Sequence, residues 1–526
     1  MCRITGTVNY PIEVATAMVN AQVKGGPDLS RVEKYGNVVL GHNLLSIIGH
    51  RPQPVADGRY SMVFNGAIYN YKELYPYATS DTDVILDHFR MKGLKAVHDF
   101  IGMFAIGLYD SVDQTIHLIV DRFGEKPIYY YHDGDTFAFA SNPAALYPLK
   151  KHWQLDREAL QSYWLLGSVM GENGLFKGIK KVCASQMVTY DIRTNTVKTE
   201  RYYEPKFHED TRDIEEIGVD AIQKVGVSDV PVHIFLSGGI DSTLVASQFV
   251  KGNAVHLNSP ERHHAQFVAN KFDINLKIVE SVDIDTEACL RDYVTNSGEP
   301  TMAGLIPYIT AREVSKFGRV AITANGADEL FFGYDRTHDD VSVKQYQHTF
   351  RDLPYPEQWP FYRLFNNDTN GRMFELGGYV QYDLNKTLDS ASMCHALEVR
   401  SPFLDYRLVE KALSIPEAIH RKKGNKTILK EMLRKMGFHN DFLNRQKLGF
   451  SLHDKPKDIE QLKAKAWKFV KENGYLQCND QLTPRDRQYL EMSALGFYFW
   501  YDVWKEKISK SESYHYDSKR DTLSTR

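Results

Sequence analysis

The sequence lacks several features that mark particular classes of protein. It has no run of about 18 apolar residues, so no segment is expected to cross a membrane. Its five cysteines are scattered without a C-x-x-C pair, which argues against a zinc site or a disulfide framework and is typical of a reducing compartment. Lysine and arginine total 64 against 67 acidic residues, so no basic field favours nucleic acid. Together with an amino terminus unlike a signal peptide, these absences predict a cytoplasmic protein.

The composition is otherwise that of an ordinary globular protein. Hydrophobic residues make up 43% and charged residues 25% of the 526 positions, which is enough chain for two or more domains. Residues 1 to about 200 alternate short apolar runs with Gly, Asn and Asp turns, which predicts a β-rich first domain. One helix is predicted there from Asp81 to Met91, with Ser80 as its N-cap. A stretch of Pro, His and acids at 204–213 is predicted to be a linker.

Beyond this linker, strands and helices alternate in the pattern of a parallel, doubly wound sheet. Helices are predicted at 214–225, 242–250, 261–271 and 306–316, and strands at 232–236, 254–257, 275–279 and 319–323. From Glu329 onward the pattern is mainly helical, with an aromatic insert at 346–374. Residues 506–526 are polar and predicted to be at least partly disordered.

One hexamer, Ser237-Gly238-Gly239-Ile240-Asp241-Ser242, lies between an apolar strand and a helix. Its two glycines let the backbone turn and approach a ligand closely, and a helix N-terminus favours phosphate oxygens. Asp241 would repel phosphates unless a cation lay between them, so it implies Mg²⁺. The lysine of a Walker loop is absent, and an ordinary Gly-rich turn is the plain alternative. The hexamer resembles the pyrophosphate loop of the ATP pyrophosphatases, which cleave ATP to AMP and pyrophosphate.

Three features of the first domain suggest nucleophilic chemistry. Cys2 becomes the first residue if Met1 is removed, and its α-amine can then take the thiol proton. Asn65 and Gly66 can donate to an oxyanion, although Asn-Gly is also a common turn pair. Asp81 can bind a substrate ammonium, or can instead complement the helix dipole.

These residues lie in stretches that resemble the class II glutamine amidotransferases, which are N-terminal-nucleophile hydrolases. The matching stretches are 41–42, 45–48, 53–54, 64–70, 80–81, 102–105 and 121–130. The resemblance implies that Cys2 attacks the side-chain amide of glutamine and releases ammonia. It also implies that Asn65 and Gly66 form the oxyanion hole and that Asp81 binds the substrate amine.

Three positions depart from this family. Arg3 stands where glycine is usual, and Ala67 replaces an acid near the substrate amine. Leu44 replaces an arginine that clamps the α-carboxylate of glutamine. Arg3 and Arg51 are the candidates to replace the missing guanidinium. Otherwise glutamine is expected to bind weakly, or another amide is used.

Further blocks follow the pyrophosphate loop at 323–334, 398–405 and 424–430, and Lys447 lies beyond them. The residues of these blocks and their order along the chain resemble those of the asparagine synthetase family, which includes β-lactam and carbapenam synthetases. The resemblance covers about residues 1–455. Those lactam-forming relatives normally lack the N-terminal cysteine. The resemblance implies that ATP adenylates a carboxylate and that ammonia from the first domain attacks the acyl-adenylate, with ATP and Mg²⁺ as cofactors.

Roles in the second domain also come from this resemblance. Lys447 is expected to stabilise charge on the phosphates, Glu398 and Arg400 to lie by the acid substrate, and Asp241 and Asp328 to hold Mg²⁺. Asn325 replaces a glutamate that is thought to help ammonia attack, and an amide cannot act as a base. The expected ATP pocket comprises Leu236, Ser237, Gly238, Gly239, Asp241, Ser242, Leu257, Thr323, Ala324, Asp328 and Lys426.

The sequence therefore predicts an N-terminal-nucleophile αββα sandwich at 1–203 and a Rossmann-like parallel α/β ATP pyrophosphatase domain with a helical C-terminal part at 214–505. The leading interpretation is a glutamine-dependent amidotransferase of the asparagine synthetase type, with aspartate as the first candidate acceptor. One alternative is another carboxylic acid, such as a sugar acid or a modified base precursor, and a second is a non-catalytic regulatory homologue. The expected partners are small molecules, without nucleic acid or a membrane, and a homodimer is left open.

Overall fold

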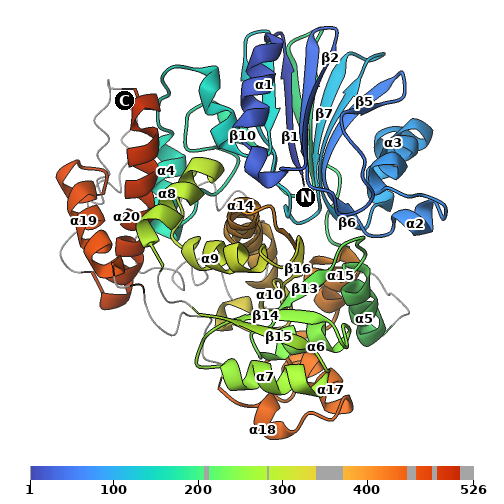
Figure 1. Cartoon of the computed structure of the whole chain (residues 1–526), viewed down its shortest axis with the longest axis vertical. Coiled ribbons are helices and arrows are strands. Elements are labelled where there is room, and N and C mark those ends of the chain that lie inside the picture. The colour runs from blue at the N-terminus through green and yellow to red at the C-terminus, as the bar shows by residue number, and fades with distance from the viewer. Residues whose placement is uncertain are drawn as a thin grey trace.

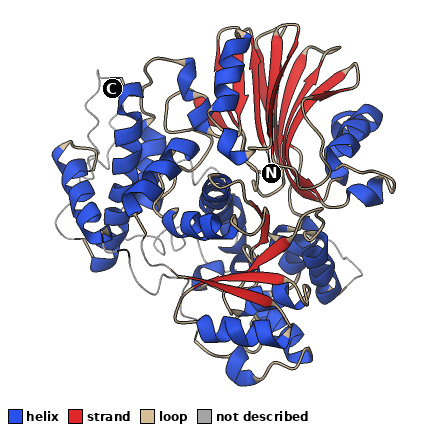
Figure 2. Cartoon of the chain, in the orientation of Figure 1, coloured by secondary structure: helices blue, strands red, loops and turns tan. Residues whose placement is uncertain are grey.

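The computed structural model describes residues 2–206, 213–280, 284–338, 371–446, 456, 458–476 and 482–509. A β-rich domain contains the amino terminus, and an α/β domain with many helices follows it (Figures 1 and 2). The amino terminus lies at the edge of the β-rich domain that faces the second domain (Figure 1).

The first domain is a sandwich of two six-stranded antiparallel sheets. In sheet order, one contains β10 (Ile179–Lys181), β8 (Tyr129–Asp133), β9 (Thr136–Ala140), β1 (Arg3–Val8), β3 (Val38–Leu44) and β2 (Leu29–Tyr35). The other contains β12 (Thr196–Arg201), β11 (Gln186–Asp191), β7 (Thr115–Val120), β6 (Gly102–Asp110), β5 (Tyr60–Ile68) and β4 (Val55–Ala56).

Helices cover the two outer faces of this sandwich, which confirms the predicted αββα layering. Helix α1 (Ile12–Asn20) packs on β1, β2 and β3, and α3 (Asp81–Lys92) packs on β4 and β5. The short α2 (Tyr71–Leu74) packs beside α3, while α4 (Arg157–Leu166) contacts the C-terminal helix of the chain. The Ser80 hydroxyl accepts a hydrogen bond from the Thr82 N–H, so the predicted helix start and N-cap are confirmed.

The second domain is built on a parallel sheet, as predicted, and this sheet has five strands in the described part of the chain. Its strand order is β15 (Asn275–Val279), β14 (Asn253–Leu257), β13 (Val232–Phe235), β16 (Val320–Ile322) and β17 (Glu398–Arg400). The accompanying helices are α5 (Ile214–Lys224), α6 (Ile240–Ser247), α7 (Arg262–Lys271), α8 (Thr286–Ser297), α9 (Leu305–Val314) and α10 (Ala327–Leu330). Strand β17 and helix α8 were absent from the sequence-based prediction.

The rest of the described chain is helical. It contains α13 (Gly371–Phe374), a π-helical segment Glu375–Asn385, α14 (Lys386–Met393), α15 (Tyr406–Ser414), α16 (Glu417–His420), α17 (Thr427–Lys435), α18 (Asn440–Leu443), α19 (Ile459–Glu472) and α20 (Pro484–Trp504). Most of the predicted aromatic insert lies outside the described residues. None of the described helices combines the length and the apolar character needed to span a bilayer.

The segment that follows α20 pairs with the first domain. Trp153 N–H donates to the Lys507 carbonyl at 2.7 Å, and Ser509 N–H donates to the Trp153 carbonyl at 2.8 Å. Backbone pairing with the first domain therefore holds residues 506–509. The prediction that 506–526 is at least partly disordered stays a prediction. Residues 510–526 lie outside the described part of the chain.

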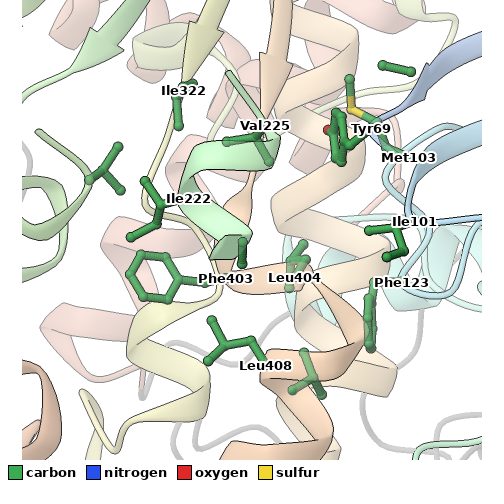
Figure 3. Close-up of a cluster of buried hydrophobic side chains, with 14 of the residues drawn as sticks. Tyr69, Ile101, Met103, Phe123, Ile222, Val225, Ile322, Phe403, Leu404 and Leu408 are labelled. Carbon is green, nitrogen blue, oxygen red and sulfur yellow. The ribbon is translucent and has the colours of Figure 1, made fainter. Parts of the chain in front are cut away.

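The two domains share one cluster of buried hydrophobic side chains (Figure 3). The first domain contributes Tyr69, Ile101, Met103 and Phe123 to this cluster. The second domain contributes Ile222, Val225, Ile322, Phe403, Leu404 and Leu408. A continuous apolar cluster stabilises domain docking, since separating the domains would expose its surface to water. The relative position of the two candidate sites is fixed by this packing.

Candidate active sites

The first candidate site surrounds Cys2, which immediately precedes β1. Its backbone N–H donates to Oδ1 of Asn65 on β5 at 3.0 Å. The Asn65 side chain is fully buried, and its Nδ2 has no hydrogen-bond partner among the described residues. A Cβ at Gly66 would lie 2.1 Å from the Met103 carbonyl oxygen, so only glycine fits there. The structure thus brings together the predicted nucleophile and the predicted oxyanion-hole residues, with a spare buried donor.

Asp81 lines the same pocket from the first turn of α3. Its Oδ2 accepts a hydrogen bond from the Ile68 N–H at 3.1 Å. Burial raises the pKa of the Asp81 carboxyl to about 7, against 3.8 for an ordinary aspartate. Burial also raises the pKa of the Cys2 thiol to about 11, and the positive amino terminus offsets this only in part. The thiol therefore requires a base before it can act as a nucleophile.

Arg3 does not serve this pocket. Its Nη1 donates to Oδ2 of Asp389 on α14 at 2.7 Å, and Nζ of Lys126 lies 3.2 Å from the other oxygen of that carboxylate. All three side chains are buried at the domain interface. Arg3 therefore does not replace the arginine that is missing at position 44, because its guanidinium neutralises Asp389. Arg51 does line the pocket, half-exposed, with its Nε 2.7 Å from Oδ1 of Asp83.

Glu398 and Arg400 lie in an unexpected place. They belong to β17 of the second domain, yet Glu398 lines the Cys2 pocket of the first. Arg400 donates from Nε to Glu398 Oε1 at 2.6 Å and from Nη1 to the carbonyls of Val225 and Val227 at 2.7 and 2.6 Å. Arg400 is fully buried and holds main-chain oxygens, so the pair lies at the domain interface. The expected role of this pair beside the acid substrate stays a prediction.

The charge of Glu398 is set by its surroundings. Burial alone would raise its pKa, but the positive amino terminus, Arg400 and Lys126 outweigh burial and lower the pKa to about 2. Glu398 is therefore ionised at neutral pH. The Cys2 pocket accordingly contains one carboxylate from each domain, Asp81 and Glu398.

The second candidate site lies at the carboxyl ends of the parallel strands, where ligands bind in open α/β sheets. After β13, Gly238 adopts a φ of +81°, and a Cβ there would lie 2.6 Å from the backbone nitrogen of Ala265. The hydroxyls of Ser237 and Ser242 lie 2.9 Å apart, and Gly239 N–H donates to Ser237 Oγ at 3.3 Å. The missing side chain of Gly238 allows α7 to pack close to the loop. The loop leads directly into the N-terminus of α6.

The other residues of the expected ATP pocket follow neighbouring strands. Leu236 follows β13, and Leu257 ends β14; both are buried. Thr323 follows β16, and its N–H donates to the Arg400 carbonyl at 2.9 Å while its Oγ1 donates to Asn325 Oδ1 at 3.0 Å. Ala324 comes next and is partly buried. The parallel register of β13, β14 and β16 thus places these residues along one edge of the sheet.

Lys426, just before α17, joins the two aspartates predicted to hold a metal ion. Its Nζ lies 2.6 Å from Asp241 Oδ2 and is also ion-paired with Asp328. Burial alone would lower the pKa of Lys426, but the two carboxylates outweigh it and raise the pKa above its usual range. Asp241 from α6, Asp328 from α10 and Lys426 therefore converge on one point beside the serine-rich loop. Lys447 lies outside the described residues.

One contact to the loop was not expected from the sequence. Arg445 donates from Nη2 to the Gly238 carbonyl at 2.6 Å and from Nη1 to Glu261 Oε1 at 2.7 Å. These two contacts tie the loop carbonyl to Glu261 through one guanidinium. The only sequence signal for Arg445 is that it lies two positions before Lys447.

Two family models match the two domains, and the chain is similar to several known proteins. A family model for a glutamine amidotransferase domain matches residues 1–203, and one for asparagine synthase matches residues 213–495. The chain is similar to asparagine synthetase (glutamine-hydrolyzing) 1 of Bacillus subtilis, with 26% identity over 551 residues, 86% of this chain and 87% of that protein. Asparagine synthetase (glutamine-hydrolyzing) 3 of the same organism is 27% identical, over 85% of this chain and 86% of that protein. Among solved structures, the allosteric regulatory enzyme of purine biosynthesis covers 67% of this chain and 79% of its own at 12% identity, with a TM-score of only 0.30.

An antiparallel amidotransferase domain headed by Cys2 and joined to a parallel α/β synthase domain defines a glutamine amidotransferase with an ATP-dependent ligase domain. The chain belongs to the glutamine-hydrolysing asparagine synthetase family.

Proposed function

We propose that the protein releases ammonia from an amide at Cys2 and uses it to amidate a carboxylate that the second domain has adenylated. Aspartate is the first candidate acceptor, and AMP and pyrophosphate are the by-products. The observation that carries this proposal is the convergence of Asp241, Asp328 and Lys426 beside the Ser-Gly-Gly loop. Two carboxylates and an ammonium at a phosphate-type loop suit pyrophosphate release from ATP.

The amidotransferase step begins at the thiol. After removal of Met1, the α-amine of Cys2 accepts the thiol proton, and the sulfur attacks the amide carbon of the donor. Asn65 Nδ2 and the Gly66 N–H stabilise the oxyanion as it forms. The amide nitrogen takes the proton and leaves as ammonia, and water then hydrolyses the thioester to the free carboxylic acid. The buried, unpartnered Nδ2 of Asn65 supports this role.

The ligase step begins with a carboxylate oxygen of the acceptor attacking the α-phosphorus of ATP, which expels pyrophosphate. Lys426, and by resemblance Lys447, balance negative charge on the phosphates. Ammonia then attacks the acyl carbon and expels AMP, giving the amide. Asp241 and Asp328 fit Mg²⁺, because a pair of carboxylates next to phosphates is its usual protein environment. When bound, the ion would neutralise the departing pyrophosphate.

The identity of the carboxylate acceptor is a separate question within the proposal. Asn325 stands where a glutamate is usual, and its side chain accepts from Thr323 Oγ1. An amide there cannot take a proton from the attacking ammonia, so this position favours keeping a second candidate, a carboxylic acid other than aspartate. A non-catalytic homologue is disfavoured, because the nucleophile and the three converging charges are present.

Product analysis tests the proposal. The purified protein would be incubated with ATP, Mg²⁺, ammonium and a panel of carboxylic acids that includes aspartate, and nucleotides and amides would be quantified. Acceptor-dependent AMP and pyrophosphate in equal amounts are expected, whereas ADP and phosphate as main products would refute the reaction type. Asp241→Asn should remove most of this turnover, with Asp87→Asn at a half-exposed position of α3 as the control.

A further inference from the structure

The charges that line the Cys2 pocket are unusual for a site that binds a free amino acid. Among the described residues lining it, Asp81 and Glu398 are acids and Arg51 is the one base. The other walls are mainly apolar and include Leu44 and Ala67, which are 4% and 1% exposed. A free α-amino acid brings an ammonium and a carboxylate on the same carbon. The ammonium has Asp81 available, but the carboxylate would face apolar walls and like charge.

The buried cationic side chains near the pocket are engaged elsewhere. Arg3 and Lys126 both neutralise Asp389 within the domain interface. Arg400 holds Glu398 and two main-chain carbonyls. Moving any of these guanidinium or ammonium groups to a ligand would take a counter-ion away from a buried acid, which is costly.

Arg51 differs from these because it lies at the rim. Its side chain is 46% exposed, and its Nε donates to Asp83 Oδ1 at 2.7 Å. To bind a substrate carboxylate, the Arg51 guanidinium would have to leave Asp83 and lose part of its hydration. An exposed arginine provides a weaker and less oriented carboxylate partner than a buried one.

A carboxylate placed in the pocket therefore loses water without gaining a fixed cationic partner, and it shares the pocket with Glu398. A primary amide at the same place is neutral and loses less on desolvation. From this charge pattern we infer that the donor pocket selects amides that carry an ammonium but no free carboxylate beside it, such as glutaminamide or an amino-terminal glutaminyl residue of a peptide. This inference rests on the proposed amide hydrolysis at Cys2.

The chemistry at the side chain is unchanged by this selectivity. The Cys2 sulfur attacks the γ-amide carbon, ammonia leaves, and water hydrolyses the thioester. From glutaminamide the products are ammonia and the α-amide of glutamate, so attack at the γ-amide is distinguished from attack at the α-amide, which would give glutamine.

The experiment compares glutamine with glutaminamide as donors for the full-length protein with Met1 removed, by ammonia release and product identification. We expect the KM for glutaminamide to be about ten- to a hundredfold below that for glutamine with similar kcat, the range of one charge-assisted hydrogen bond. Leu44→Arg should reverse the order by lowering the KM for glutamine, while Leu44→Met, which keeps the size without the charge, should preserve it.

Two outcomes would overturn the inference. A lower KM for glutamine than for glutaminamide, raised selectively by Arg51→Ala, would mean that Arg51 clamps the carboxylate; the proposed function would then stand unchanged. In the second outcome, neither donor is turned over and mass spectrometry finds no thioester on Cys2. That result would refute both this inference and the amidotransferase half of the proposed function. ATP cleavage with free ammonium would then show whether the ligase half survives.

Discussion

Lys426 Nζ lies 2.6 Å from Asp241 Oδ2 and is shared with Asp328, so a lysine ammonium occupies the point where two predicted metal ligands converge. All three side chains are largely buried. The ammonium keeps two like charges together, and they would otherwise repel each other at low dielectric. Lys426 thus serves as the internal counter-ion of the site.

The first prediction concerns that counter-ion. Lys426→Met removes the ammonium that both carboxylates share, and breaking a buried ion pair costs about 3–5 kcal/mol of unfolding free energy. Mg²⁺ should restore part of this loss in the variant and have a smaller effect on wild type, because a cation that binds only the folded state stabilises it. Thermal unfolding with and without Mg²⁺ measures both effects. Lys422→Met, at an exposed position, is the control; equal responses to Mg²⁺ in all three proteins would contradict the prediction.

The second prediction separates the two domains chemically. Cys2→Ala should abolish amide-dependent product formation while ammonia-dependent formation continues, because the second site needs only ammonia. Cys183→Ala removes another buried thiol of the first domain and should leave both activities close to wild type. Donor-dependent activity that survives in Cys2→Ala would exclude Cys2 as the nucleophile.

The third prediction contrasts two arginines. Arg3→Ala leaves Asp389 with only Lys126 and should lower the free energy of unfolding by up to about 3–5 kcal/mol, the scale for breaking a buried ion pair, without a specific change in donor KM. Arg51→Ala should change stability by less than about 1 kcal/mol, because its pair with Asp83 is exposed. Denaturant unfolding and donor kinetics on both variants provide the comparison. A large rise in donor KM for Arg3→Ala at unchanged stability would contradict the assignment of Arg3 to the interface.

The fourth prediction uses the raised pKa of Asp81. The carboxyl titrates near 7 in the fold but near 3.8 when unfolded, so between these values only the folded state holds the proton. Stability is then lost as pH rises from about 4 to about 7, by a few kcal/mol at most, since each pKa unit corresponds to about 1.4 kcal/mol. Asp81→Asn should flatten this part of the stability curve and raise stability at pH 8 while weakening donor binding. Asp87→Asn on the same helix should leave the slope as in wild type; an unchanged slope in Asp81→Asn would refute the prediction.

The sequence predicted those elements whose residue pattern is visible within a few neighbouring positions. Strands β13, β14, β15 and β16 were predicted to within two residues at each end, because strands buried in a parallel sheet appear as short apolar runs. Helix α8 was missed even though local signals exist. Asp285 caps it through the Ala288 N–H, and Gly298 ends it in the left-handed conformation.

The remaining differences come from long-range packing. Strand β17 has only three residues, two of them charged, and it is a strand because it pairs with β16 about 78 positions earlier. No local pattern places Glu398 beside Cys2 or Arg3 on Asp389, because both relationships depend on how two domains dock. Within the candidate sites, the motif residues were therefore predictable from the sequence, whereas the assignment of charged side chains to one site or the other was not.

Strand β17 also bears on how such enzymes can be recombined. It pairs within the synthase sheet, yet its first residue, Glu398, forms part of the wall around Cys2. A chimaera that joins residues 2–206 to the synthase half of another protein would inherit the nucleophile and its oxyanion donors but receive this part of the wall from the host. Substitutions near position 398 would then alter the donor chemistry of a domain in which they do not reside. The two halves are thus expected to evolve together, and the pocket is inherited as a property of the whole chain.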